Sequence, residues 1–128
     1  MTKNCQTLTE HPTPDELLAS LTRFVPEFEV EWKRSNFRNE DGSFTVHGVF
    51  AEFSAFFRDH VEEMEESTRR DLFTFVEDCV TTDPTSEAGL SNAACTCFLE
   101  NLAGEGKISD LVSKYLGPES KAYFDKWN

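Results

Sequence analysis

Apolar side chains three and four residues apart run through the stretch from about residue 45 to residue 64. Such spacing places side chains on one face of an α-helix, because about 3.6 residues complete a turn. The chain holds twelve phenylalanines in 128 residues, enough to offset the entropy of ordering one domain. We therefore expect a packed helical core. The residues that carry the pattern are Val46, Val49, Phe50, Phe53, Phe57 and Met64.

Start and stop signals divide the rest of the chain into further helices. A capping box at Thr13 and Glu16 starts the first helix, Pro26 ends it, and Pro118 starts the last. Other helices are expected over about residues 28–35, 68–81 (stopped at 83–84), 87–102 and 108–116, with Gly117 closing the last of these at the C′ position. Residues 28–32 also alternate as a strand would, and we favour a helix because the surrounding segments are helical.

These elements predict an all-α fold, a compact bundle of about six or seven helices with antiparallel neighbours, because short turns join successive helices. Residues 1–12 are polar and are expected to form a flexible N-terminal arm, and residues 13–128 a single helical domain. No secretory leader or bilayer-spanning stretch is visible, so we expect a cytoplasmic protein with reduced thiols. Of its four cysteines, Cys79, Cys95 and Cys97 are expected in the core and Cys5 in the arm.

Negative charge is concentrated in one part of the chain. The formal net charge is −12, and residues 59–105 hold twelve acidic residues against Arg69 and Arg70. Such a surface disfavours nucleic acid and anionic membranes, and it complements a basic protein. Two alternatives remain: a solvated face without a partner, or a new helix that starts near Glu65 and places the later acids favourably at its N-terminus.

Six acidic residues are the candidates for contact with a partner. If the helix that begins near residue 45 continues to Met64, several of them crowd its C-terminal end, where the helix dipole favours cations. A basic partner would relieve that repulsion. The candidates are Asp59, Glu62, Glu63, Glu66, Glu77 and Asp78.

The sequence gives little indication of catalysis. His60 and Glu63 form an i, i+3 pair, but a di-metal helical bundle needs a second such pair, and none is visible. No glycine-rich phosphate loop or recognisable catalytic triad is present. We expect no enzyme activity, no metal and no cofactor. A metal-dependent enzyme that uses His60 ranks below the two binding hypotheses given next.

The C-terminal third holds the pattern Cys97-Phe98-Leu99-Glu100-Asn101-Leu102, then Tyr115-Leu116-Gly117-Pro118-Glu119-Ser120, then Trp127. This pattern resembles small acidic helical proteins of bacteria, some of which resemble immunity proteins that neutralise toxins of neighbouring cells. The resemblance implies an immunity or antitoxin-type inhibitor of a basic, nuclease-like toxin, since nuclease clefts tend to be basic. The alternative is a helical adaptor or regulatory module for another basic partner. The motifs that carry the resemblance consist of packing and capping residues. The resemblance therefore assigns no functional residue to this chain.

Overall fold

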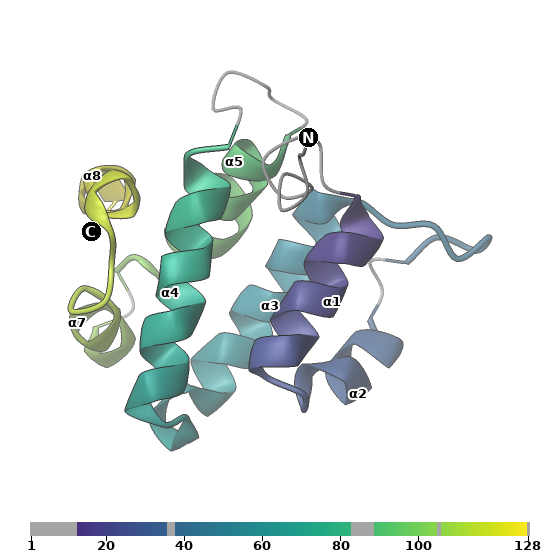
Figure 1. Cartoon of the computed structure of the whole chain (residues 1–128), viewed down its shortest axis with the longest axis horizontal. Helices are drawn as coiled ribbons and strands as arrows, with labels where there is room; N and C mark the ends of the chain where they lie inside the picture. The colour runs from purple at the N-terminus through teal and green to yellow at the C-terminus, as the bar shows by residue number, and fades with distance from the viewer. Residues whose placement is uncertain (1–12, 36–37, 83–88, 105, 128) are drawn as a thin grey trace, which may run out of the picture.

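Helices form nearly all of the regular structure (Figure 1), and two of them start at a threonine whose side chain caps the helix. The computed structural model describes residues 13–35, 38–82, 89–104 and 106–127. The expected arm at residues 1–12, the expected stop at residues 83–84 and the helix start expected near residue 87 lie outside these residues. No strand is present in the described ranges.

The first helix, α1 (Pro14–Phe24), begins at the expected capping box. The Glu16 N–H donates to the Thr13 hydroxyl oxygen at 3.1 Å, and the Thr13 N–H donates to the Glu16 carboxylate at 2.9 Å. These two bonds satisfy N–H groups that a helix start would otherwise leave unpaired. Local sequence chemistry therefore fixes where this helix begins.

The segment with the strand-like alternation is a helix, α2 (Phe28–Lys33). Its two large aromatic residues, Phe28 and Trp32, lie one turn apart, and both are buried. Val30, which the alternating pattern would have buried with them, is instead exposed. Helical spacing therefore decides which side chains of this segment reach the core.

The next helix, α3 (Val46–His60), ends four residues before the predicted end at Met64. A 3-10 turn, η2 (Val61–Glu63), follows, and the extended backbone of Met64 (φ −78°, ψ 145°) breaks the helical path. The next helix, α4 (Glu66–Val80), then starts in a new direction. We call residues 59–66 the α3–α4 corner.

Arg69 holds the α3–α4 corner from within α4. Its Nε donates to the Val61 carbonyl oxygen at 3.1 Å, and its Nη2 donates to the Glu62 carbonyl oxygen at 3.3 Å. Carbonyl groups at the end of a helical run lack partners within that run. Arg69 supplies them with charge-assisted hydrogen bonds, so its donors are engaged with backbone atoms.

One continuous helical run crosses the centre of the molecule. It consists of α5 (Leu90–Ala93), the π-helical segment η3 (Ala94–Leu99) and α6 (Glu100–Leu102). Phe98 in this run is fully buried. Its ring centroid lies within 5.9 Å of the ring centroids of Phe50, Phe53, Phe57 and Phe73.

Two helices follow the central run, and the first is shorter than predicted. α7 (Lys107–Val112) ends before residue 116 and is followed by turns. The prediction that Gly117 closes this helix is wrong, because α7 ends at Val112 with Ser113 as its C-cap. Gly117 instead directly precedes α8 (Pro118–Trp127). Its carbonyl oxygen accepts a hydrogen bond from the Lys121 N–H at 2.8 Å.

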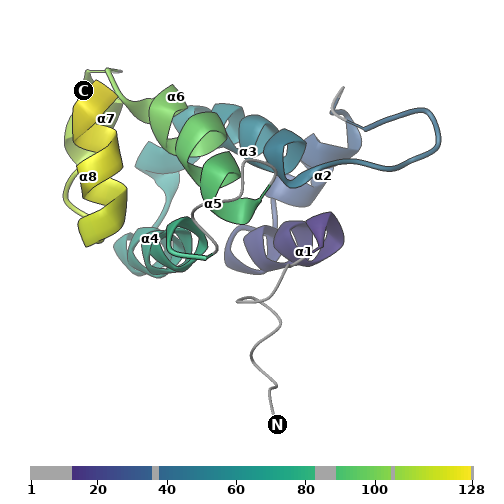
Figure 2. The same ribbon diagram turned by 90° about the horizontal axis from the view of Figure 1, so that it is seen from above.

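The helices pack in two layers with a cap at one end (Figure 2). α1 and α4 lie in one layer, α3 and the central run lie in the other, and α7 and α8 stand together at one end. The phenylalanine-rich core fills the space between the layers. With the central run counted once, the described residues form seven α-helices, so the prediction of a compact all-α bundle is confirmed. No helix among them is both long enough and apolar enough to cross a bilayer.

Candidate functional site: a pocket beside the α3–α4 corner

The six acidic candidates fall into two groups at opposite ends of α4. The first group surrounds the α3–α4 corner, and the second lies near the C-terminal end of α4, about 18 Å further along the helix axis at 1.5 Å per residue. The structure thus brings four candidates together and separates the other two from them. The first group is Asp59, Glu62, Glu63 and Glu66, all exposed, and the second is Glu77 and Asp78.

Part of the charge at the corner is paired on the surface. The Glu62 carboxylate lies 3.4 Å from Lys107 Nζ, and the Glu66 carboxylate pairs with Arg70. Both pairs are solvent-exposed, so each contributes only about 0–1 kcal/mol. Because α4 starts at Glu66, this carboxylate also lies favourably at a helix N-terminus. The predicted unfavourable crowding therefore applies to the acids before Met64, not to those after it.

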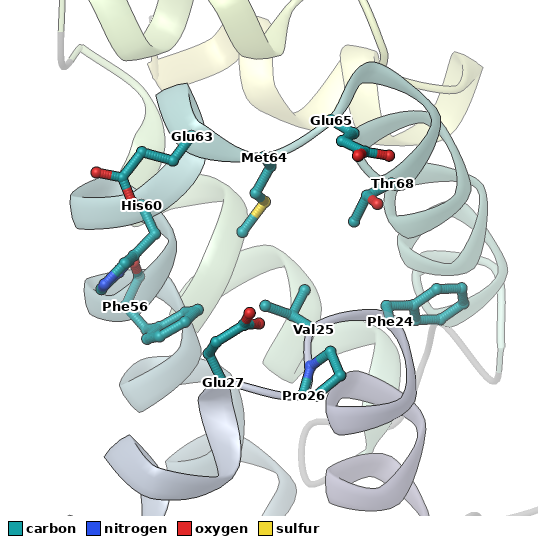
Figure 3. Close-up of a pocket in the computed structure, with 10 residues that line it drawn as sticks. All are labelled: Phe24, Val25, Pro26, Glu27, Phe56, His60, Glu63, Met64, Glu65 and Thr68. Atoms are coloured by element: carbon teal, nitrogen blue, oxygen red, sulfur yellow. The ribbon is translucent and has the colours of Figure 1, made fainter.

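A pocket opens between the α3–α4 corner and the connection from α1 to α2 (Figure 3). Its volume is about 390 Å³, within the usual range for pockets that bind small groups. Three segments that are distant in sequence line it: the α1–α2 connection, the end of α3 and the start of α4. Apolar lining comes from Phe24, Val25, Pro26, Phe56 and Met64, and polar lining from Glu27, His60, Glu63, Glu65 and Thr68.

Stacked rings form one wall of the pocket. The imidazole of His60 lies on the ring of Phe56, with centroids 4.2 Å apart and planes 19° apart. Phe56 is held in turn by the buried Phe28, at 5.5 Å between ring centroids. His60 Nδ1 lies 2.9 Å from the Phe56 carbonyl oxygen. A carbonyl oxygen only accepts, so Nδ1 carries the proton and donates it. Packing and this hydrogen bond together fix the wall.

Three carboxylates belong to the pocket, from Glu27, Glu63 and Glu65. None of the three makes a side-chain hydrogen bond or an ion pair with any residue that the structure describes. Among the described residues, no lysine or arginine lines the pocket. Figure 3 shows the side chain of Glu27 reaching up from the α1–α2 connection toward Met64. The pocket therefore combines apolar lining with negative charge that no described residue pairs with.

Two of these carboxylates were not among the residues predicted from sequence. Glu65 belongs to the crowded acids of the sequence, or to a new helix start, but not to the six contact candidates, and the sequence assigns no role to Glu27. Glu27 lies more than thirty residues from the acidic segment, and only the packing of α2 against α3 brings it to the pocket. Its position directly after Pro26, in a connection between helices, was the one available signal that its side chain would be exposed.

Glu77 serves the fold rather than an open surface. Its carboxylate accepts hydrogen bonds from the Glu119 N–H at 3.1 Å, the Ser120 N–H at 2.9 Å and the Ser120 hydroxyl at 2.8 Å. Burial disfavours the charged form, but the hydrogen bonds from Ser120 and Glu119 outweigh it and lower the pKa of Glu77. The carboxylate caps the N-terminus of α8, whose positive dipole end favours it. Asp78 beside it is exposed.

His60 was also considered as a possible metal ligand, which would need further ligands close to it. Within the part of the chain that the structure describes, no group of three or more His, Cys, Asp and Glu side chains is placed to hold a metal ion. His47 lies apart from this region, with Nε2 3.0 Å from the Asn92 Oδ1.

Three cysteines are described, and all are free thiols. Cys79 is fully buried, as predicted, and burial raises the pKa of its thiol far above the ordinary range. Cys95 and Cys97 are only half-buried, so the prediction that they are core residues is wrong in degree. They lie in the π-helical segment at the edge of the core.

The fold and the pocket define the class of this protein: a small all-α bundle with a pocket that apolar and polar side chains line together, three of them carboxylates. Residues 18–128 match a family described as "Domain of unknown function (DUF7674)", and the chain belongs to this family. The matched segment contains every residue that lines the pocket. No curated protein and no solved structure matches the chain.

Proposed function

We propose that the chain is a protein-binding inhibitor of the immunity or antitoxin type, which neutralises a basic, nuclease-like toxin through the α3–α4 corner. One observation supports this above the others: three carboxylates that form no ion pair with any described residue lie around a pocket with partly apolar lining. Further acids at the corner, Asp59 and Glu62, extend the same charge along the surface. A nuclease cleft that accepts phosphate groups presents the complementary charge.

The two features of the site make different contributions to binding. Exposed acids steer a basic partner and raise the rate of association, an effect that salt weakens. Apolar lining contributes the free energy of burying surface on contact. No lysine or arginine is among the described residues that line the pocket, so a basic group that enters meets no like charge from them. The proposal also places the protein in the cytoplasm, where free thiols such as Cys79 persist.

Coexpression with a candidate toxin tests this proposal. The candidate is the protein encoded beside the gene, provided that it carries a basic C-terminal domain. The expected result is restored growth of the expressing cells and loss of nuclease activity in the purified complex. A stable complex in which the partner keeps its activity would favour the adaptor instead. Absence of both a complex and growth rescue would contradict the proposal.

A further inference from the structure

Residues 38–45, which lead into α3, extend away from the helical layers and contain an exposed turn (Figure 1, Figure 2). The turn holds Asp41-Gly42, the one aspartate–glycine pair in the sequence. Glycine has no side chain to shield its backbone nitrogen from the carboxyl group of the residue before it. In a flexible peptide, aspartate before glycine therefore rearranges slowly to isoaspartate, in which the backbone runs through the side-chain carboxyl carbon.

The rearrangement has two steps and needs only water as a co-reactant. In the first step, the Gly42 nitrogen attacks Cγ of the neutral Asp41 carboxylic acid. An N–Cγ bond forms, the C–OH bond breaks, and the hydroxyl group leaves as water with the proton of the Gly42 N–H. In the second step, water opens the cyclic imide. Attack at Cγ regenerates aspartate, whereas attack at the Asp41 backbone carbonyl carbon breaks its bond to nitrogen and leaves isoaspartate.

The turn holds the carboxyl group in a form that opposes the first step. Asp41 Oδ1 accepts hydrogen bonds from the Ser43 N–H at 2.9 Å and from the Ser43 hydroxyl at 2.7 Å. Hydrogen bonds to the charged form favour it, so the Ser43 N–H, and after it the hydroxyl, lowers the pKa of Asp41. Only the neutral acid has a hydroxyl group that can leave. The two bonds therefore reduce the reactive fraction, and they also restrain the side chain.

The attacking nitrogen is held by the same turn. The Gly42 N–H donates to the Asn39 carbonyl oxygen at 2.9 Å, and the Asn39 N–H donates to the Ser43 carbonyl oxygen at 2.8 Å. The side chain of Asn39 adds a third link, because its Nδ2 donates to Ser43 Oγ at 2.9 Å. The proton that must leave the Gly42 nitrogen is thus engaged in a backbone hydrogen bond, and closing the imide ring requires the turn to open.

We propose that Asp41 is a modification site at which isoaspartate forms, and that the Ser43 hydroxyl slows the reaction by holding the carboxylate. Ser43 is a positioning residue, since it acts through Asp41 and takes no part in the bonds that form or break. Isoaspartate adds one carbon to the backbone of the turn, which changes the spacing between Asn39 and Ser43. The modification therefore alters an exposed loop, while the buried core lies outside the reacting segment.

Incubation of the purified chain at about pH 6, where a small neutral fraction of an ordinary aspartate remains, tests this inference. The reference is the peptide acetyl-Arg-Asn-Glu-Asp-Gly-Ser-Phe-amide, which has the sequence of residues 38–44 without the fold. An isoaspartyl methyltransferase with labelled S-adenosylmethionine counts the modified residues, and fragment mass spectrometry locates them. The chain should form isoaspartate at residue 41 roughly tenfold or more slowly than the peptide, because hydrogen bonds hold the carboxylate in its unreactive form.

Variants of the turn separate the role of the hydroxyl from loosening of the loop. Ser43→Ala should speed the reaction about threefold or more, since the carboxylate loses one of its two hydrogen bonds, whereas Ser43→Thr keeps a hydroxyl and should stay slow. Asn39→Ala is the matched control, because it removes a side-chain link of the turn and leaves both bonds to Asp41 in place. It should speed the reaction less than Ser43→Ala does. Thermal melting reports whether each variant remains folded.

Three outcomes would overturn the inference. A chain that reacts as fast as the peptide would mean that the turn gives no protection. Equal acceleration by Ser43→Ala and Asn39→Ala would mean that loosening of the loop sets the rate, not the bond to the carboxylate. Absence of isoaspartate at residue 41 from both the unaltered chain and Ser43→Ala, with the peptide reacting, would remove the site itself. Asp41→Glu, which cannot close the five-membered ring, gives the background for all of these measurements.

Discussion

The carboxylate of Glu77 lies where a β-carbon on residue 117 would stand. A Cβ built on Gly117 would approach Glu77 Oε1 to 2.5 Å and Cδ to 2.6 Å, closer than such atoms come in proteins. Glycine at this position therefore lets a side chain of α4 reach the start of α8 and accept hydrogen bonds from Glu119 and Ser120. The Gly117-Pro118 pair therefore starts α8 and also leaves space for the carboxylate of Glu77 from α4.

Gly117→Ala should lower the free energy of unfolding by about 1–3 kcal/mol, since the added methyl group displaces the Glu77 carboxylate from its hydrogen bonds. Glu77→Ala should have a similar cost for the same reason. Urea denaturation of the two single variants and the double variant completes the cycle. If Gly117→Ala costs as much in the Glu77→Ala background as alone, the two residues are not coupled in this way.

Glu77 should also make stability depend on acid pH. Its pKa in the folded chain is lowered, so the stability it contributes is present above the ordinary glutamate pKa of about 4.3. This stability is lost as the pH falls from that value through the lower, folded-state pKa. The difference in unfolding free energy between the unaltered chain and Glu77→Gln should be largest at neutral pH and shrink in acid. A difference that stays constant from pH 7 to pH 3 would contradict this assignment.

Phe98→Ala should cost about 3–5 kcal/mol of unfolding free energy, because it leaves a cavity among four other rings. Phe44→Ala is the control. Phe44 is only half-buried, although it packs against Trp32 at 5.0 Å between ring centroids, so its loss should be clearly smaller. Chemical denaturation measures both. A loss below about 1 kcal/mol for Phe98→Ala would mean that the surrounding rings do not depend on it.

Cys79 should resist thiol reagents in the native protein. It is fully buried, and the raised pKa leaves almost none of it as the reactive thiolate. Maleimide treatment followed by mass spectrometry should show Cys5 modified first, Cys95 and Cys97 more slowly, and Cys79 only after unfolding. Early modification of Cys79 would indicate that the core opens without global unfolding.

Charge reversal at the corner should slow association with a basic partner. Glu62→Lys/Glu63→Lys should lower the association rate constant roughly tenfold at low salt and reduce its salt dependence. Asp78→Lys/Glu119→Lys changes the net charge equally at the other end of α4 and should have a smaller effect. Stopped-flow or biosensor kinetics measure both, and equal effects would show that net charge, not the corner, steers binding.

Stability should change little in the reversed corner variant. Glu62→Lys loses only an exposed pair with Lys107, which contributes about 0–1 kcal/mol, and Glu63 makes no ion pair among the described residues. A large drop in melting temperature would show that these acids are structural.

Much of the fold follows from local chemistry, which the sequence displays directly. The capping box at Thr13, the proline at residue 118 and the spacing of Phe50, Phe53 and Phe57 each act within a few residues. The end of α3 was misplaced because Met64 continues the apolar spacing, although the chain bends before it. Met64 packs against the core from outside the helix, so its apolar character signals burial without signalling the helix.

The candidate site was only half predictable for a different reason. Glu63 was found because the acidic segment is continuous in sequence, whereas Glu27 reaches the pocket only through the packing of α2 against α3. Glu77 was grouped with the corner acids by charge alone, and its actual role depends on contact with α8, about forty residues away. Charge patterns in a sequence show how many acidic residues there are. They do not show which of these residues form hydrogen bonds within the fold and which stay available to a partner.

The π-helical segment in the central run has a geometric consequence for the core. Leu90, Ala94, Phe98 and Leu102 are buried at intervals of four residues. In a plain α-helix each four-residue step would rotate the side chain about 40° onward, so the stripe would wind around the axis. The π segment (Ala94–Leu99) has i→i+5 hydrogen bonds and a wider turn, which counteracts that drift. The wide turns thus keep these four buried side chains within a narrower sector around the helix axis than a plain α-helix of the same length would.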